Sequence, residues 1–210
     1  MATASKKVTL PIHLGLDLVK KISNRGAFIE MLISSFLSLI ASFVLAVDAV
    51  KLAANPLTEL SCNISEKISC ASVGLSWQAS AFGFPNAFLG LISEPVVITI
   101  AIASLGGVKF PRWFMLGAQL MYSIGLVFAY WLFFQSYFVI GALCPWCLLI
   151  TAATTLVFAS ITRVNVMRGN IRFPQAMQSI VLRLFRIGVD IWLTCLVLTV
   201  VAAMVIVRYL

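Results

Sequence analysis

The longest uncharged stretch of the sequence limits the fold more than any other feature. From Phe114 to Thr162 the chain has 49 residues without an aspartate, glutamate, lysine or arginine. A single helix of that length would extend roughly 73 Å, more than twice the ~30 Å hydrocarbon core of a bilayer. The stretch must therefore fold back on itself, and Gly141 and Pro145 mark the turn. We predict two membrane-spanning helices here, at about 114–137 and 144–162.

Three more apolar runs are long enough to cross a membrane, since a spanning helix needs ~20 mostly apolar residues. They are Phe28–Val50, Asn86–Leu105 and Gly188–Val207. The first run is too long for a signal-peptide core and no small-x-small cleavage motif follows it, so we expect it to be retained. Only 10% of the residues are charged, against ~25% in soluble domains. The predicted fold class is an all-α integral membrane protein with five transmembrane helices.

Basic residues are distributed unevenly between the two sides of these helices. Most of the 15 lie before the first helix, between the second and third, or between the fourth and fifth. Cytoplasmic loops carry such an excess, so we predict a multi-pass protein of the cytoplasmic (inner) membrane. Its N-terminus would be cytoplasmic and its C-terminus outside. This topology accounts for the net charge of +8 without nucleic-acid binding.

The topology divides the chain into four parts. They are a cytoplasmic segment at 1–27, a four-helix bundle at 28–163 with an outer loop at about 51–85, a cytoplasmic basic connector at 164–187, and the fifth helix at 188–210. Within the connector, Gln175–Ile187 is amphipathic and basic. We expect it to lie on the anionic inner leaflet.

Four of the five cysteines fall on the predicted outer side, where disulfides persist. Cys62 and Cys70 lie in the outer loop, and Cys144 and Cys147 lie at the outer end of the fourth helix. On a straight helix Cys62 and Cys70 would be ~12 Å apart, too far for a disulfide. A bridge therefore requires the chain between them to turn back, and it would be either a structural staple or a redox pair. Cys195, within the fifth helix, is expected to be a packing residue.

The CPWC motif at 144–147 has the features of a redox pair at a helix N-terminus. Proline is favoured at the first helical position, which makes Cys144 the cap and Cys147 the third helical residue. Free N–H groups and the positive end of the helix dipole stabilise a thiolate there. Cys147 would lie ~4.5 Å further into the bilayer than Cys144. This arrangement suits a relay from a protein thiol to a lipid-soluble acceptor.

A zinc site that uses all four outer cysteines is the main alternative chemistry. Structural zinc sites usually combine two closely spaced pairs, whereas Cys62 and Cys70 are eight residues apart. The single histidine, His13, lies on the predicted cytoplasmic side, outside every predicted span. We therefore expect neither a metal nor a haem.

Two stretches, SCNISEKISCASVGLSWQASAFGFPNAFLG at 61–90 and ALCPWC at 142–147, resemble the vitamin K epoxide reductase (VKOR) family in its bacterial quinone-linked branch. The family pattern is a loop cysteine pair, a serine soon after it, a glycine and an asparagine entering the second helix, and CxxC on the fourth. The matching residues are Cys62, Cys70, Ser76, Gly83, Asn86, Cys144 and Cys147. Oxidants of the DsbB type have similar chemistry, but the opposite order of the two cysteine pairs.

The resemblance implies a four-helix bundle around a quinone, either a menaquinone or a ubiquinone. Cys144 and Cys147 would be the active-site pair, with Cys147 nearest the quinone. Cys62 and Cys70 would be the shuttle pair, exchanging electrons with a separate thioredoxin-fold protein outside the membrane. Asn86 would either bond a quinone oxygen or simply cap its helix.

Four more residues are expected to affect the site or its activity. Ser76 would stabilise the outer loop. Glu94 lies within the second span, where an ionisable side chain suggests a function; it would deliver protons or pair with another helix. Asp48, at the outer end of the first helix, would be interfacial or would affect protons at the site. Thr151 stands where the vertebrate enzymes carry a tyrosine, a departure that bears on epoxide reduction and coumarin sensitivity.

The predicted function is that of a membrane thiol–disulfide oxidoreductase. It would pass electrons from the thioredoxin-fold protein through two cysteine pairs to a quinone and so generate protein disulfides. The alternative is a non-enzymatic membrane scaffold or transporter whose disulfides only staple its outer face.

Overall fold

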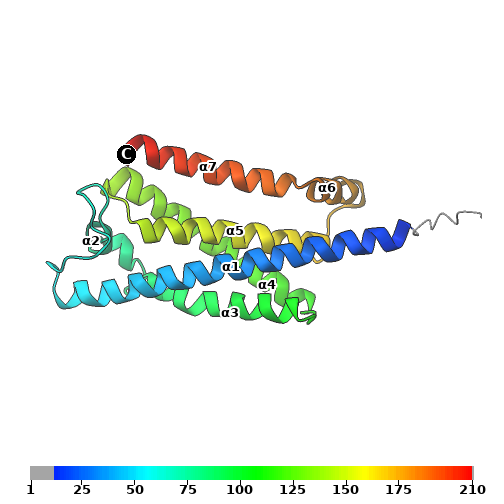
Figure 1. Cartoon of the computed structure of the whole chain (residues 1–210), viewed down its shortest axis with the longest axis horizontal. Helices are drawn as coiled ribbons and strands as arrows, with labels where there is room; N and C mark the ends of the chain where they lie inside the picture. Colours follow the sequence, from blue (N-terminus) through cyan, green and yellow to red (C-terminus); the bar gives the residue numbers. More distant parts are fainter. Residues whose placement is uncertain (1–11, 210) are drawn as a thin grey trace, which may run out of the picture.

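Five helices long and apolar enough to cross a membrane run side by side along the molecule (Figure 1). The computed structural model describes residues 12–209, and no β-strand forms among them. In chain order the elements are α1 (Ile12–Ala54), α2 (Cys70–Gly74), the 3-10 turn η1 (Trp77–Ser80), α3 (Ala87–Leu105), α4 (Arg112–Phe134), the π-helical segment η2 (Gln135–Ile140), α5 (Pro145–Met167), α6 (Gln175–Ile187) and α7 (Val189–Tyr209). The predicted fold class, an all-α multi-pass membrane protein, is confirmed.

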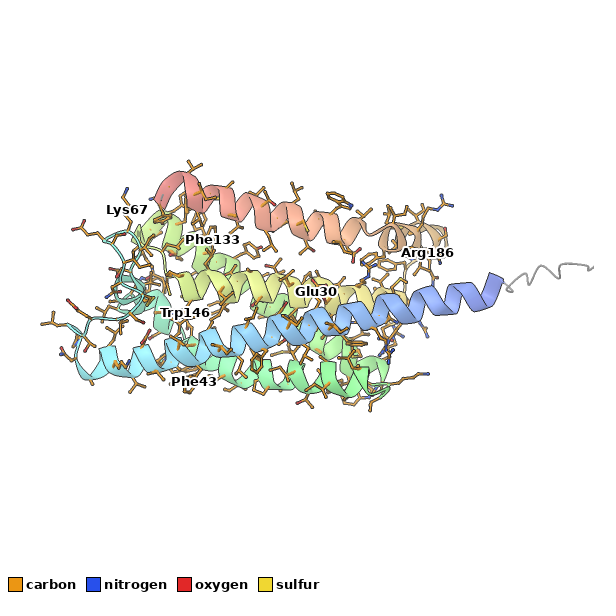
Figure 2. The ribbon with its side chains drawn as sticks, in the orientation of Figure 1. Glu30, Phe43, Lys67, Phe133, Trp146 and Arg186 are labelled. Carbon is orange, nitrogen blue, oxygen red and sulfur yellow. A yellow bond between two sulfur atoms is a disulfide. The ribbon has the colours of Figure 1, made fainter. Side chains whose placement is uncertain are left out.

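The two predicted cysteine pairs lie at one end of the bundle, which we call the cysteine end. The loop between α1 and α3 covers this end, and α6 lies at the opposite end (Figure 1). Lys67 and Arg186 mark the two ends, and the surface between them is covered mainly by apolar side chains (Figure 2). A bilayer accommodates such a surface, because exposed apolar side chains there face lipid instead of water.

Small residues allow α1 and α3 to pack closely near the cysteine end. Ser35, Ser38 and Ser42 lie on α1 and are fully buried. Gly90 of α3 faces Ser42, and a Cβ atom at Gly90 would overlap the Ser42 side chain. Small residues at helix contacts let the backbones approach, which is how membrane helices gain packing contacts.

A cluster of large apolar side chains packs the bundle further from the cysteine end. It is formed by residues of α1, α3, α4 and α5, including Phe28, Met31, Ile100, Met115 and Ile161. All five are almost completely buried. This core holds the four helices together, so that the cysteine end is supported by a packed bundle.

The fifth helix is attached by an ion pair. Arg163 Nη1 on α5 donates to both carboxylate oxygens of Asp190 on α7, at 2.9 Å to Oδ1 and 2.7 Å to Oδ2. Most other large side chains of α7 are exposed, as expected for a helix that faces lipid on several sides. The amphipathic segment expected at 175–187 forms α6 with these bounds.

Several helix boundaries differ from the sequence-based expectation, including the end of the fourth span, which continues past 162 to Met167. α1 is already helical at Ile12, so it includes much of the segment 1–27 that was expected to precede the first span; residues 1–11 lie outside the described part of the chain. The third span continues beyond 137 to Ile140 through the π-helical segment. The chain then reverses at Gly141, whose φ of +73° is the left-handed conformation that glycine adopts without strain. The predicted turn is therefore confirmed.

Candidate active site

A short pairing of two backbones brings the two cysteine pairs together. Ser69 N donates to Leu143 O at 3.1 Å, and Leu143 N donates to Lys67 O at 2.9 Å. These bonds form an isolated parallel bridge between Ile68 and Leu143. Cys70 and Cys144 follow this bridge directly in their segments. The loop before α2 and the turn before α5 are thus fixed side by side, two segments more than 70 residues apart in the chain.

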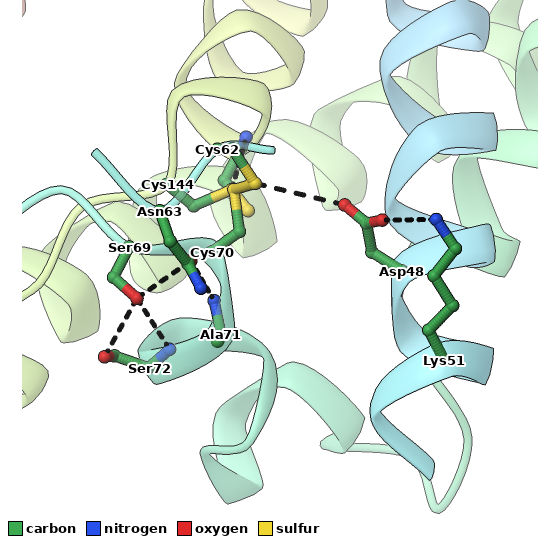
Figure 3. Close-up of a disulfide and its surroundings, with 10 residues drawn as sticks. Asp48, Lys51, Cys62, Asn63, Ser69, Cys70, Ala71, Ser72 and Cys144 are labelled. Atoms are coloured by element: carbon green, nitrogen blue, oxygen red, sulfur yellow. Dashed lines mark hydrogen bonds and ion pairs between the residues drawn. A yellow bond between two sulfur atoms is a disulfide. The ribbon is translucent and has the colours of Figure 1, made fainter. Parts of the chain in front are cut away.

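Asn63 closes the loop that joins the first cysteine pair. Its Oδ1 accepts hydrogen bonds from Ser69 Oγ and from Ala71 N, both at 3.1 Å (Figure 3). Ser69 Oγ in turn accepts from Ser72 N at 3.2 Å and caps α2. The chain between Cys62 and Cys70 therefore turns back, and the two cysteines form a disulfide with a Cα–Cα distance of 5.7 Å.

Asn63→Ala is expected to make the loop disulfide easier to reduce. The substitution removes two hydrogen bonds made by an exposed side chain, each of which contributes roughly 0.5–1.5 kcal/mol. Because a folded loop holds the two thiols together, we expect the reduction potential to rise by ~30 mV for each ~1.4 kcal/mol lost. Equilibration with glutathione redox buffers measures the shift. Ser61→Ala, an exposed change in the same loop, is the matched control; equal potentials in the two variants would show that Asn63 does not hold the loop.

The CPWC segment adopts the geometry predicted for it. Cys144 is the N-cap of α5 with extended backbone dihedrals, Pro145 occupies the first helical turn, and Cys144 Sγ accepts from Cys147 N at 3.4 Å. Cys144 is only 1% exposed. The pKa of the Cys144 thiol is lowered chiefly by the hydrogen bond from the Cys147 thiol, with help from the backbone N–H groups of Cys147 and Trp146, while burial and the charge of Asp48 oppose the effect.

The central feature of the site is the approach of the two pairs to each other. Cys144 Sγ lies 3.3 Å from Cys70 Sγ, and Cys144 and Cys147 are free thiols (Figure 3). A free thiol whose pKa is lowered by its surroundings is thus in contact with a disulfide sulfur, which is the encounter that thiol–disulfide exchange requires. A disulfide with a purely structural role does not require a free thiol in contact with it.

Asp48 lies on the other side of the loop disulfide. Its side chain is buried at the end of α1, with Oδ2 3.9 Å from Cys62 Sγ and Oδ1 3.9 Å from Lys51 Nζ (Figure 3). When Cys62 is reduced, this carboxylate is placed to accept a hydrogen bond from its S–H group. The carboxylate also opposes thiolate formation at Cys144, as like charges do.

Substitutions of Asp48 and Lys51 should therefore move the pKa of Cys144 in opposite directions. Asp48→Asn removes a negative charge, so the Cys144 thiolate should form at lower pH. Lys51→Ala removes the cation that partly neutralises Asp48, so the thiolate should form at higher pH. Ultraviolet thiolate absorbance against pH, in a Cys195→Ala background, measures both shifts. Shifts of the same sign would contradict the electrostatic explanation.

A large apolar cavity lies beneath the loop, and most of the predicted site residues line it. Its volume is about 1040 Å³. The predicted site residues on its wall are Asp48, Cys70, Ser76, Asn86, Glu94, Cys144 and Cys147. Cys62 is not on the wall, but its disulfide joins it to Cys70. Aromatic side chains supply much of the remaining surface, including Trp77, Phe82, Phe84 and Phe128.

Asn86 and Ser76 differ in what they contribute. Asn86 is at the N-terminus of α3, but its side chain makes no capping bond there. Instead Nδ2 donates to Gln78 O at 2.6 Å, and the buried Oδ1 has no hydrogen-bond partner. Ser76 Oγ donates to Val73 O at 2.6 Å and so stabilises the loop. Thr151 also lines the cavity, and its hydroxyl donates to Cys147 O at 3.0 Å.

Sequence reasoning missed three polar residues of this region. Gln78 supplies the carbonyl that binds Asn86, and Ser38 and Tyr122 donate hydrogen bonds to Glu94. The serines of α1 recur at helical spacing (Ser35, Ser38 and Ser42), which is a signal for a polar buried face. The sequence holds no comparable signal for Gln78 or Tyr122. Among the described residues, no group of three or more histidine, cysteine, aspartate or glutamate side chains is arranged to hold a metal ion.

Comparison with known proteins agrees with this geometry. The sequence model of the vitamin K epoxide reductase family matches residues 29–162, which is more than half of the chain. A search of curated proteins finds no match. The matched range includes both cysteine pairs, all of α3 and α4, and most of α1 and α5. The chain therefore belongs to the vitamin K epoxide reductase family and is a membrane thiol–disulfide oxidoreductase.

Proposed function

We propose that this protein takes electrons from a thioredoxin-fold protein outside the membrane and passes them through two cysteine pairs to a quinone. The protein thereby generates disulfides in its partner. The observation that carries the proposal is the 3.3 Å distance between Cys70 Sγ and Cys144 Sγ, which joins the loop pair to the helix pair. A scaffold with two independent staples does not account for this contact.

In the proposed orientation the cysteine end faces the outside of the cytoplasmic membrane. The connections at the opposite end carry most of the basic residues, as cytoplasmic connections do. The basic helix α6 lies at that end, where it would rest on the inner leaflet. Both loop cysteines would then be on the side where disulfides persist.

Electron entry begins with the first thiolate of the donor. It attacks Cys62 Sγ, the Cys62–Cys70 bond breaks, and Cys70 leaves as a thiolate. Cys70 then attacks Cys144 Sγ of an oxidised Cys144–Cys147 pair, so that the Cys70–Cys144 bond forms and Cys147 leaves as a thiolate in the cavity. Because Cys62 is buried, the donor must displace part of the loop to reach it.

The exchange is completed by the second thiol of the donor. It attacks the donor sulfur bound to Cys62, which releases the donor with its own disulfide and frees Cys62. Cys62 then attacks Cys70 Sγ, the loop disulfide forms again, and Cys144 leaves as a thiolate. Two donor thiols have been oxidised and one CxxC disulfide reduced. The resulting arrangement, a closed loop disulfide beside two free CxxC thiols, is that of the structure.

The cavity fits the quinone to which the family is generally linked. Its wall is mostly apolar and aromatic, and it includes Cys147 and the amide of Asn86. Asn86 Nδ2 has a second N–H besides the one that donates to Gln78 O, and this N–H would donate to a quinone oxygen; the unpartnered, buried Oδ1 would accept from a hydroxyl of the hydroquinone. Asn86 and the aromatic residues would hold the ring beside Cys147. When bound, a quinone supplies the acceptor for the two electrons that leave the dithiol, and its reduction takes up two protons.

The proposal is tested with purified protein, a reduced thioredoxin-fold protein and oxygen-free buffer. We expect donor disulfides to form only when a quinone is added, and water-soluble analogues of menaquinone and ubiquinone would show which class the cavity accepts. Equal donor oxidation with and without quinone would contradict a quinone acceptor. Absence of donor oxidation with either class would contradict the whole route.

A further inference from the structure

We propose that Glu94 is the acid that holds a proton for quinone reduction, and that Ser38 and Tyr122 position its carboxyl group in both protonation states. The inference rests on the function proposed above and adds a residue that acts after thiol exchange. It starts from a buried ionisable side chain that the exchange chemistry does not use.

Glu94 occupies an unusual position for a carboxyl group. It lies within the membrane-spanning helix α3, it is only 3% exposed, and it lines the same cavity as Cys144 and Cys147. Ionisable residues inside a span are costly, and those that persist usually face a cavity or a polar partner. Within the described part of the chain, no lysine or arginine forms an ion pair with Glu94. A permanent structural charge would be expected to have such a counter-ion.

The hydrogen bonds of Glu94 suit a group that gains and loses a proton. Ser38 Oγ donates to Oε1 at 2.8 Å, and Tyr122 OH donates to Oε2 at 2.9 Å. Each carboxyl oxygen thus has one hydroxyl partner, contributed by a different helix. A hydroxyl can donate to a carboxylate and can also accept from a carboxylic acid. Both states of Glu94 are therefore bound without moving a helix.

Close packing of α1 and α3 creates this arrangement. Gly90 lies against Ser42, where any larger residue would overlap the serine side chain. One helical turn further along α3 is Glu94, and one turn back along α1 is Ser38. The absence of a side chain at Gly90 thus lets the helices approach so that Ser38 reaches Glu94.

The number of protons that quinone reduction takes up gives Glu94 a role. Reduction of a quinone to a hydroquinone takes up two electrons and two protons, and closure of the Cys144–Cys147 disulfide releases the two electrons. In the exchange proposed above Cys144 is released as a thiolate, so it brings no proton of its own to this step. The dithiol then brings one proton fewer than the reaction needs. Glu94 gives up the missing proton from its carboxyl oxygen, and its carboxylate is stabilised by Ser38 and Tyr122.

Glu94 must regain its proton in each cycle. The donor thiols release two protons for each disulfide formed, so the overall reaction balances. The cavity that Glu94 lines also reaches Cys70 and Asp48 beneath the loop, so water that enters it with the loop displaced would carry the proton. Asp48 is the other carboxylate on that wall, and it lies beside the loop disulfide where donor thiols react.

Glu94→Gln tests the proposal, because glutamine keeps the size and hydrogen bonding of the side chain but holds no transferable proton. We expect kcat for quinone reduction to fall ~100-fold, within the range for loss of a general acid. Quinone affinity, measured by quenching of tryptophan fluorescence, should be unchanged. Glu94→Asp should restore part of kcat. The solvent isotope effect on kcat should increase in Glu94→Gln, because proton delivery becomes limiting.

The matched control is Ser104→Ala, a buried polar change on the same helix outside the cavity. We expect it to retain the wild-type kcat. A quinone-free measurement, the formation of the Cys70–Cys144 disulfide in Cys62→Ala, Cys147→Ala protein, should be the same with glutamate or glutamine at 94. An unchanged kcat in Glu94→Gln, or a loss explained by weaker quinone binding, would overturn the role of Glu94. Failure of the quinone-free exchange with glutamate present would instead overturn the proposed function.

Discussion

Protein that carries Cys62→Ala and Cys147→Ala together is expected to accumulate a disulfide between Cys70 and Cys144. Each substitution removes the normal partner of one remaining cysteine, so neither original disulfide can form. The two remaining sulfurs are 3.3 Å apart and are held there by the backbone bridge between Ile68 and Leu143. With a mild oxidant, most of the protein should therefore contain the new bond. Mass spectrometry of peptides digested without reduction identifies it directly.

The matched control for this experiment is the Cys62→Ala, Cys144→Ala protein. It retains one loop cysteine and one CxxC cysteine, but it lacks the sulfur that contacts Cys70. We expect far less cross-linking in this protein under the same oxidant. If the first variant is well folded and forms no Cys70–Cys144 bond, the two pairs do not exchange and the proposed order of steps is wrong.

Cys147→Ala is expected to abolish quinone-dependent oxidation of the donor. Cys144 would still exchange with Cys70, but its disulfide with position 147 could not close and no electron pair would leave for the quinone. Because the residues of a reacting unit depend on one another, a loss of ~10³-fold or more is expected. Initial rates of donor thiol loss with excess quinone measure the effect.

Cys195→Ala controls for the loss of a thiol as such. Cys195 is an exposed cysteine of α7 and does not line the cavity beneath the loop. We expect this variant to retain the wild-type rate. A Cys147→Ala protein that retained a comparable rate would show that electrons leave by another route.

The features that could be predicted from the sequence depend on local chain chemistry or on hydropathy. The spans follow from lengths of apolar sequence, the reversal at Gly141 from a glycine, and the cap at Cys144 from the proline after it. Each of these signals lies within a few residues of the structure it specifies. The two cysteine pairs, together with the serine, glycine and asparagine between them and in that order, indicated the family, which the family model confirms.

Features that depend on contacts between distant helices could not be predicted. Glu94 could be singled out as an ionisable residue in a span, but its partners Ser38 and Tyr122 are 56 and 28 residues away. These contacts depend on how three helices are rotated about their axes and how deeply each lies in the membrane. The apolar composition of a span specifies neither quantity. The bridge from Ile68 to Leu143 likewise consists of backbone bonds, which any residue pair can form. The extension of α4 through a π-helical segment has no evident sequence signal.

Stoichiometry shows whether the dithiol at the membrane edge passes electrons from protein thiols to a quinone. Purified wild-type protein is mixed with a reduced thioredoxin-fold donor and a soluble quinone, and quinone absorbance and donor thiols are followed together. We expect one quinone to be reduced for each donor disulfide formed, and both signals to stop in Cys147→Ala. Donor oxidation without matching quinone loss, or no change in either signal with several quinones and donors, would contradict this expectation.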